Sequence, residues 1–290
     1  MTRPADTSPV RLHIVHTTTF AYPEPVVVSY NEARMTPLSS GAQRVVASTL
    51  TVDPQTWATT YTDYWGTQVT AFEVLAPHQS LWIVAEHVVE VRPPAPLTTT
   101  VGWDVLRAAA TVDRRAEYLT DVPVTVPPDE VVALATEAVV GLDPAEAALA
   151  VCEAVRAQMS YIPGVTTAHT PASEAWAARA GVCQDIAHLA VGALRAVGIP
   201  ARYVSGYLHP AHDGGPDDVG RTVSGQSHAW VEWWVGGWSA HDPTNSVPVG
   251  THHVRLGRGR CYDDVAPLRG IYAGGAAADL EVEVRITRQA

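Results

Sequence analysis

Hydrophobic and polar residues alternate over the first third of the chain, whereas they follow a helical spacing over much of the remainder. Up to residue 91, short runs of alternating or β-branched residues are separated by turn-forming residues such as Pro23, Gly41 and Pro54. Runs with this spacing are typical of the strands of a small sandwich or barrel. The strands that the pattern predicts are Leu12–Phe20, Val26–Met35, Val45–Val52, Gln68–Leu75 and Leu81–Val91.

The segment YTDYWG, which carries Tyr61, Tyr64 and Trp65, lies between two of these strands. Its aromatic side chains could line a binding surface. Large aromatic residues contribute most of their energy when they are buried or paired. We therefore favour the interpretation that they belong to a core or pair across neighbouring strands.

A proline-rich segment, Arg92–Pro96 (RPPAP), separates the two kinds of pattern and is predicted to be an extended, semi-rigid linker. The segments after it are rich in alanine and place apolar residues at helical spacing. The helices expected from this spacing are Val101–Tyr118, Asp129–Val140, Pro144–Met159 and Ser173–Ala180. The sequence thus predicts an α+β protein that consists of a disordered N-terminus (1–9), an N-terminal β domain (10–93), a linker (94–100) and a second domain (101–290).

A strongly amphipathic helix follows Gly181. Its buried stripe consists of Ile186, Leu189, Ala190, Ala193, Leu194 and Val197. Cys183 falls in the first turn, where unpaired backbone N–H groups and the positive end of the helix dipole favour a thiolate. The same N–H groups can stabilise an oxyanion on an attacked carbonyl. Asp185 would oppose thiolate formation if its carboxylate faced the sulfur, so a nearby imidazolium is required.

The chain has twelve histidines, of which we favour His228 as the base. It opens the predicted strand Ala229–Val235, just after a turn. His188 is closer to Cys183 in sequence, but it lies about 140° around the helix and is expected to be a packed or capped residue. The choice of His228 then depends on whether the next strand places the carboxylate of Asp242 on the same face of the sheet as His228.

Gly236 and Gly237 predict a hairpin turn after this strand. A plain two-residue turn would place Asp242 on the face opposite His228 and would put His241, the fallback base, on the His228 face. A loop longer by one residue reverses every face. It brings Asp242 diagonal to His228, at a Cβ separation of roughly 7–8 Å that suits a hydrogen bond. The catalytic interpretation requires this shifted register, which we predict.

Three side chains would then form a Cys–His–Asp site. Cys183 is the expected nucleophile, His228 takes its proton and later gives it to the leaving amine, and Asp242 fixes the imidazole tautomer and stabilises the imidazolium. The backbone N–H of Cys183 is expected to form half of the oxyanion hole. The candidates for the second donor are Tyr161, Trp176 and Gln184.

Two pairs of histidines, His209 with His212 and His252 with His253, raise the alternative of metal-dependent hydrolysis. The first pair lies in a loop without further ligands, and adjacent residues of an extended segment point to opposite faces. We therefore expect no metal and no cofactor.

Cys152, which has apolar neighbours in a predicted helix, is expected to be a small buried hydrophobe.

The chain resembles the bacterial transglutaminase-like superfamily in three core blocks, GVCQDIAHLAVGALRAVGIPARYVSGYL, SHAWVEWWVGGW and DPTN. The catalytic residues of that family match Cys183, His228 and Asp242, which follow one another at spacings of 45 and 14 residues. The segments RMTPLSS and DYWGTQVTAFEV resemble the N-terminal domain that precedes this core in many bacterial members. The resemblance implies a papain-like core, in which a Cys-bearing helix packs on an antiparallel sheet, preceded by an N-terminal β-sandwich domain.

The resemblance also implies thiol chemistry on amide or ester carbonyls through an acyl-enzyme. Because members include cysteine proteases, amidases and cross-linking acyltransferases, we expect a peptide or protein substrate with an amide side chain or a peptide bond, and water or an amine as acceptor. Trp230 and Asn245 are candidate substrate-binding residues. Tryptophans near the His228 strand form either a channel that excludes water or a sheet core. The alternative function is a catalytically silent binding or assembly module.

Composition narrows the partners and the compartment. The formal net charge of −11, without large basic clusters, makes nucleic acid and anionic membranes poor partners. No apolar segment typical of a secretory signal is visible at the start, and no run of about 18 apolar residues predicts a membrane span. Three cysteines without a C-x-x-C pair fit free thiols in a reducing cytosol. A cytoplasmic location is therefore expected.

Overall fold

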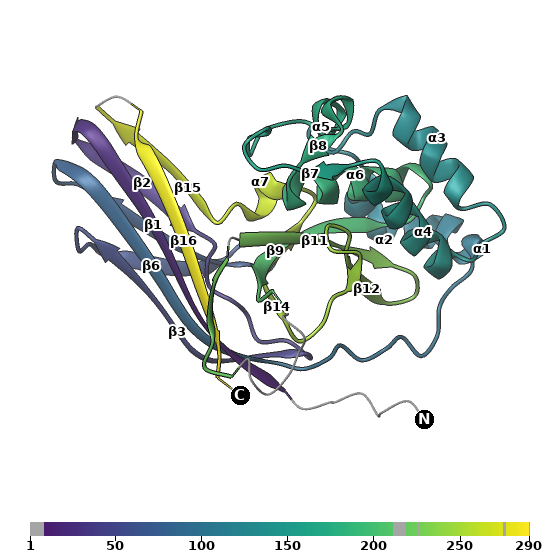
Figure 1. Ribbon diagram of the computed structural model, residues 1–290, viewed down its shortest axis with the longest axis horizontal. Coiled ribbons are helices and arrows are strands. Elements are labelled where there is room, and N and C mark those ends of the chain that lie inside the picture. Colours follow the sequence, from purple (N-terminus) through teal and green to yellow (C-terminus); the bar gives the residue numbers. More distant parts are fainter. Residues whose placement is uncertain (1–8, 211–218, 226, 275–276, 290) are drawn as a thin grey trace.

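The computed structural model describes residues 9–210, 219–225, 227–274 and 277–289. This part of the chain has the predicted α+β fold, with long antiparallel strands on one side and helices packed on a further sheet on the other (Figure 1). The described residues include only Pro9 of the segment 1–9 that is predicted to be disordered. They also exclude His212, which is predicted to lie in a loop. None of the helices in the described ranges has the length and apolar character that a bilayer span requires.

The strands of the two sheets built on the N-terminal segment are β1 (Val10–Val26), β2 (Val28–Ala33), β3 (Gln43–Asp53), β4 (Ala58–Thr62), β5 (Gln68–Val74), β6 (His78–Val91), β10 (Thr222–Gly225), β15 (Leu268–Ala273) and β16 (Asp279–Arg288). The other strands are β7 (Ser160–Tyr161), β8 (Ala180–Gly181), β9 (Ala201–Leu208), β11 (Ser227–Trp234), β12 (Trp238–Asp242), β13 (Val247–Pro248) and β14 (His253–Gly259). The helices are α1 (Trp103–Arg107), α2 (Ala109–Leu119), α3 (Asp129–Ala138), α4 (Pro144–Ala157), α5 (Ala172–Ala178), α6 (Cys183–Ala196) and α7 (Tyr262–Val265).

The N-terminal segment forms a β-sandwich, as its alternating pattern predicts. The strand orders of the two sheets are β10-β16-β1-β6-β3 and β15-β2-β5-β4. Every second residue of β1 from Val10 to Thr18 is buried, because one face of the strand points inward. The core between the sheets consists of Tyr22, Val26, Ala33, Met35, Phe72, Val74, Leu81, Ile83 and Ala85.

The last strands of the described chain complete the sheets that the first strands begin. β16 lies between β1 and β10, with Leu12 paired to Arg288, and β15 pairs with β2. Figure 1 shows β16 running alongside β1. The division of the chain at residues 94–100 stays a prediction. The strand pairing, however, places Leu268–Ala273 and Asp279–Arg288 in the sheets of the N-terminal segment.

The candidate site lies on the sheet β13-β12-β11-β9-β14, which has helices on one face. α6 packs on β9 and β11 and contacts α3, α4 and α5. It ends before Gly198 as predicted, in a Schellman turn in which the N–H of Ile199 donates to Leu194 O at 2.9 Å. The predicted single helix Val101–Tyr118 is wrong. It is divided into α1 and α2 because the backbone of Ala108 is extended, with ψ 135°.

The N-terminal strands and the core sheet share a hydrophobic cluster. It consists of Val10, Leu12, Ile14, Val89, Val91, Tyr207, Val223, Val254, Leu256, Val284 and Ile286. Gln43 reinforces this joint, because its side-chain amide donates to Arg255 O at 2.9 Å and accepts the N–H of Arg255 at 2.8 Å. The sandwich is therefore fixed against the sheet that carries the candidate site.

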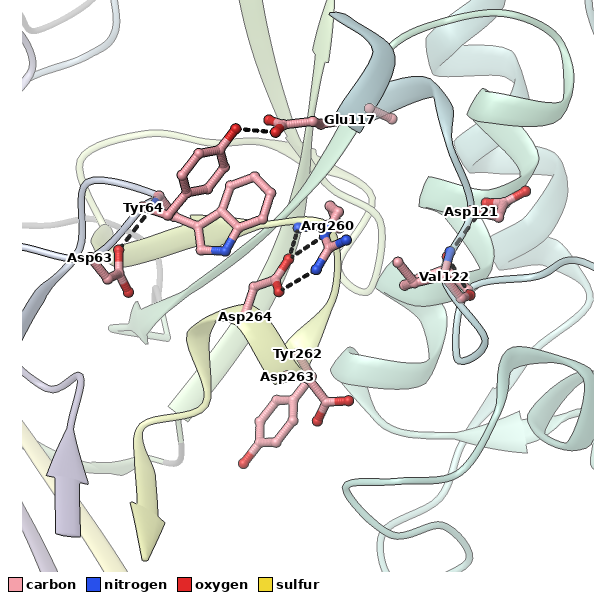
Figure 2. Close-up of polar contacts among 12 residues, drawn as sticks. Asp63, Tyr64, Glu117, Asp121, Val122, Arg260, Tyr262, Asp263 and Asp264 are labelled. Carbon is pink, nitrogen blue, oxygen red and sulfur yellow. Dashed lines mark hydrogen bonds and ion pairs between the residues drawn. The ribbon is translucent and has the colours of Figure 1, made fainter.

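The segment YTDYWG forms a second joint, part of which is shown in Figure 2. Tyr64 is 75% exposed, and its hydroxyl donates to Glu117 of α2. The ring of Trp65 lies 5.2 Å from the guanidinium carbon of Arg260, which pairs with Asp264 at 2.9 Å. Tyr64 and Trp65 thus connect the sandwich to the core. The favoured interpretation, that they belong to a core or pair across strands, is wrong for these two residues.

Candidate active site

Cys183 is the first residue of α6 and is partly exposed. Asp185 is buried, and its Oδ2 accepts the N–H of Val182 and the hydroxyl of Thr166, both at 2.7 Å. Burial raises the pKa of this carboxyl group. Asp185 therefore acts as a cap that closes the start of the helix. Gly181 leaves room for it, since a Cβ there would lie 2.6 Å from Asp185 Oδ2.

The hairpin of β11 and β12 has the predicted shifted register. Val231 pairs with His241, so the connecting loop is one residue longer than a two-residue turn, and Asp242 lies on the His228 face. His228 Nε2 is 2.8 Å from Asp242 Oδ2, and the thiol of Cys183 is a hydrogen-bond partner of the same imidazole. His241, the fallback base, faces the other side of the sheet. Cys183, His228 and Asp242 thus form one connected chain of contacts.

Asp242 has no solvent exposure, and several donors surround its carboxylate. Oδ1 accepts the backbone N–H groups of Thr244 at 3.0 Å and Asn245 at 3.2 Å. Oδ2 accepts the side-chain amide of Asn245 at 2.7 Å as well as His228. Burial alone would raise the pKa of Asp242, but the hydrogen bonds outweigh it and hold the pKa well below its usual value. Asp242 is therefore ionised and accepts from every partner.

His253 of β14 is a further partner of Asp242 that sequence reasoning missed. Its Nε2 lies 3.3 Å from Asp242 Oδ2, and its Nδ1 accepts the N–H of Gly250 at 3.2 Å. A backbone N–H can only donate, so Nδ1 is unprotonated and Nε2 carries the hydrogen that points to Asp242. Ligand atoms of His228, Asp242 and His253 lie within 4.8 Å of one another, close enough for a metal site. The protonated Nε2 of His253 suits a hydrogen bond and opposes metal ligation.

The protonation of His228 reflects its two partners. Burial lowers the pKa of this imidazole, but the hydrogen bonds to Asp242 and Cys183 outweigh burial and raise the pKa from 6.5 to about 9. The imidazolium form of His228 is therefore favoured at neutral pH. The sequence analysis required an imidazolium near Cys183 to favour its thiolate, and protonated His228 is such a group.

Of the three candidates for the second oxyanion donor, two have side chains that are engaged elsewhere. The indole N–H of Trp176 donates to Glu130 Oε2 at 2.8 Å, and the side-chain amide of Gln184 donates to Ala168 O at 2.9 Å. The hydroxyl of Tyr161 has no such partner among the hydrogen bonds of the described residues. Burial, and to a smaller extent the charge of the neighbouring cysteine, raise the pKa of Tyr161.

The two candidate substrate-binding residues have other surroundings than expected. Trp230 is 1% exposed, and Trp233 of the same strand is buried as well, so both belong to the packed sheet rather than to an open channel. The side-chain amide of Asn245 is engaged with Asp242. Neither Trp230 nor Asn245 lines the groove beside His228, so the expected role in substrate binding stays a prediction for both residues.

Two sequence interpretations of residues near the site are confirmed. His188 is completely buried in α6, and its Nε2 accepts the N–H of Tyr262 at 3.0 Å. Burial lowers the pKa of this imidazole to about 3, so it is neutral. Cys152 is completely buried in the hydrophobic core around α6, and burial raises its pKa far above the usual value.

An open groove of about 480 Å³ lies beside His228. One wall comes from the core, with Tyr161 and Leu208, and the other comes from β16 of the sandwich, with Val282 and Glu283. A larger depression of about 610 Å³ lies on the outer face of the sheet β15-β2-β5-β4, but its lining residues include no cysteine and no histidine. Of these two hollows, the groove is the one that a residue of the candidate site, His228, lines.

Related proteins share both the sequence and the fold. An uncharacterized protein of Mycobacterium leprae is 43% identical over 280 residues, which cover 97% of this chain and 99% of that protein. An uncharacterized protein of Mycobacterium tuberculosis is 34% identical over 294 residues, covering 95% and 92%. The crystal structure of a candidate cysteine protease from Cytophaga hutchinsonii has the same fold, with a TM-score of 0.72 and 20% identity over 97% of this chain and 98% of that one.

Two family profiles match successive parts of the chain. The profile described as the transglutaminase-like superfamily matches residues 133–243, which include the helix of Cys183 and the strands of His228 and Asp242. The profile described as the bacterial transglutaminase-like N-terminal region matches residues 12–90, most of the N-terminal strands. The chain therefore belongs to the transglutaminase-like superfamily and carries the bacterial N-terminal region ahead of the superfamily core.

Proposed function

We propose that this protein is a cysteine-dependent enzyme that cleaves or transfers amide bonds of peptide or protein substrates through a thioester acyl-enzyme. The observation that carries the proposal is the chain of contacts from Cys183, at the start of α6, through His228 to Asp242. These residues supply a nucleophile, a base and an orienting carboxylate, the parts that acyl transfer requires. Membership of the superfamily supports the same chemistry.

The proposed reaction begins with the sulfur of Cys183 attacking the carbonyl carbon. Nε2 of His228 is engaged with Asp242, so Nδ1 is the nitrogen that holds the thiol proton. The C–S bond forms while the carbonyl electron pair moves onto oxygen. When this pair returns, the C–N bond breaks and the amine leaves with the proton from His228, which produces a thioester. Water or a primary amine then attacks the thioester, His228 takes its proton, and the thiol is released.

Two groups are the candidates to stabilise the oxyanion. The backbone N–H of Cys183 belongs to the first turn of α6, where amides lack intrahelical partners. Tyr161 lines the groove beside His228, and its hydroxyl is the candidate for the second donor. Removal of one oxyanion donor typically lowers turnover by roughly 10²–10³-fold, so we expect Tyr161→Phe to fall in this range.

The proposal is tested with a peptide library that is incubated with the full-length protein, with and without a primary amine, and read by mass spectrometry. Hydrolysis adds one water per cleaved amide, whereas transfer adds the amine and releases ammonia or a peptide amine. The Cys183→Ala variant is the matched control, and Cys152→Ala removes a buried thiol instead. We expect turnover and labelling by a thiol-directed acylating probe to require Cys183.

Undiminished labelling in Cys183→Ala would contradict the assignment of the nucleophile. A wild-type protein that is neither labelled nor active, but binds peptides, would instead favour the catalytically silent binding or assembly module. The ratio of hydrolysis to transfer in the wild type then distinguishes a protease or amidase from an acyltransferase.

We further propose that the protein acts in the cytoplasm. Its three cysteines, Cys152, Cys183 and Cys261, are all free thiols, which fits a reducing compartment. Fractionation of cells that produce the tagged protein tests this location, and recovery in the extracytoplasmic fraction would contradict it.

A further inference from the structure

A second cavity, of about 510 Å³, lies on the face of the core sheet that α6 leaves uncovered. Ala229 and Val231 of β11 pack toward α6, whereas Trp230 and Glu232, which alternate with them, line this cavity. The linker after β6 and the turn before β3 form its outer wall. The cavity therefore lies between the sandwich and the core sheet, away from the groove beside His228.

The lining of this cavity is strongly positive. It contains the arginines Arg92, Arg202, Arg255 and Arg258, and Glu232 is the only carboxylate among its described lining residues. The carboxylate of Glu232 is shared between Arg202, whose Nε donates to Oε2 at 2.6 Å, and Arg255, whose Nη1 lies 3.7 Å from Oε1. In a protein with a formal net charge of −11, the gathering of arginines at one cavity is a local excess of positive charge.

Arg258 makes no ion pair or side-chain hydrogen bond with the part of the chain that the structure describes, and it is only partly exposed. Burial lowers the pKa of Arg202 and of Arg255, Glu232 raises both, and the charge of Arg258 lowers both again. The three guanidinium groups therefore repel one another, and one carboxylate does not balance them.

Trp230 adds an unused neutral donor to the same lining. Its indole Nε1 is buried and has no acceptor among the described residues. A buried donor without an acceptor costs roughly 1–3 kcal/mol relative to a satisfied one. Guanidinium groups and an indole N–H offer only hydrogens, so the ligand that they suit is an acceptor with negative charge.

We infer that this cavity is a binding site for a small organic anion that carries a carboxylate or a phosphate group, with Arg258 as the free guanidinium that holds it. Arginine pairs with both groups through two parallel hydrogen bonds. The volume lies within the range of small-molecule sites. His253 also borders the cavity and donates to Asp242, so a bound anion lies next to a residue that supports the triad.

The inference is tested on the full-length protein by calorimetric titration with inorganic phosphate and, separately, with malonate, at constant ionic strength set with sodium chloride. We expect saturable binding of at least one anion, and binding of only one would identify the chemistry. Arg258→Gln and Arg92→Gln should each weaken binding about tenfold or more, whereas Arg114→Gln, on the exposed surface of α2, should not change it.

A second measurement follows the tryptophan indole N–H signals by NMR during the same titrations. We expect one indole signal to move with the calorimetric saturation curve, and the Trp230→Phe variant to lack that signal. Absence of saturable binding of both anions, or equal affinity in Arg258→Gln and the wild type, would overturn the inference. Neither readout depends on catalytic activity.

Discussion

At the scale of single residues, Asp242 is the most highly constrained group of the candidate site. It is fully buried, and it accepts hydrogen bonds from two histidines, one side-chain amide and two backbone N–H groups. Its charge is thus stabilised by fixed donors instead of water. One of these donors, His228, is also the partner of Cys183, so the carboxylate determines the orientation and the protonation of the base.

The pKa of His228 provides a direct test of the contact with Cys183. In the wild type the hydrogen bonds to Asp242 and Cys183 raise this pKa to about 9 against the effect of burial. The Cys183→Ala variant removes one of these two partners, so we expect a lower pKa there. ¹⁵N NMR titration of the imidazole measures both values. Equal pKa values in the two proteins would show that the thiol does not act on His228.

The same shift predicts a pH dependence of stability. The folded-state pKa of about 9 is above the unfolded value of 6.5, so this group stabilises the fold fully below pH 6.5. The contribution is lost as the pH rises from 6.5 through 9. Urea unfolding at pH 6, 7.5 and 9 measures the decline, and His228→Gln, which lacks the titrating group, should show a shallower one.

His253 is predicted to be a positioning residue. His253→Phe removes a donor to Asp242 and leaves more of the carboxylate charge to His228, so the pKa of His228 should rise and the alkaline limb of the activity profile should move to higher pH. We expect kcat/KM to decrease about 10–100-fold, as is found for other residues that orient a reactive group from behind. His253→Gln keeps a donor and should recover part of the loss. An unchanged pH profile in His253→Phe would contradict this role.

The sequence was sufficient to predict that Cys183, His228 and Asp242 lie together, but not that His253 contacts Asp242. Cys183, His228 and Asp242 stand out because a helix start, a strand and a hairpin loop each restrict where their side chains point. His253 does not, because its contact with Asp242 depends on the pairing of β14 with β9, which contains a bulge between Arg255 and Gly257. The sequence showed only two adjacent histidines, which were considered as metal ligands and set aside.

At the scale of elements, the turn that precedes α6 is tightly packed. The side chain of the Asp185 cap lies against Gly181, where a methyl group would lie 2.7 Å from Asp185 Cβ. The other end is closed by Gly198 in a left-handed conformation. Both glycines were visible in the sequence, and for this reason the helix bounds were predicted well.

We expect Gly181→Ala to displace the start of α6. Overpacking of this kind costs about 1–3 kcal/mol, and it moves Cys183 relative to His228. Urea unfolding should show the loss of stability, and labelling of Cys183 by an acylating probe should be slower. Gly41→Ala is the matched control, because a Cβ at position 41 would meet no atom within 4 Å. Equal labelling rates in the two variants would contradict the expectation.

The elements that sequence reasoning missed lack the usual signals. All residues of β4 (ATTYT) are exposed, so no buried face produces an alternating pattern. The break between α1 and α2 falls at Ala108, a residue with high helix propensity, so nothing in the local sequence indicates it. By contrast, β1 and β6 were predicted because one face of each is buried in the sandwich.

At the scale of the whole molecule, the sandwich and the core are tied together by the end of the chain. Ile286 of β16 is fully buried in the cluster shared by the sandwich and the core sheet, whereas Ile271 of β15 is 72% exposed. Local pattern cannot predict this arrangement, because β1, one of the two partners of β16, lies at the opposite end of the sequence. The sequence therefore predicted the two fold types but not the pairing of β15 and β16.

These two isoleucines provide a matched test of the joint. Ile286→Ala should lower the free energy of unfolding by about 2–5 kcal/mol, because it leaves a cavity in a packed core. Ile271→Ala should change it by no more than about 0.5 kcal/mol. Chemical denaturation measures both. A loss in Ile286→Ala no greater than in Ile271→Ala would show that β16 is not packed as described.

The position of β16 also bears on how the protein is made. During synthesis on the ribosome, β1 emerges long before β16, which is one of the two strands that pair with it. The same strand supplies Val282 and Glu283 to the wall of the groove beside His228. A nascent chain thus contains Cys183 well before the groove is complete. Because such distant pairing is slow, we expect the groove beside His228 to be completed only in the last steps of folding.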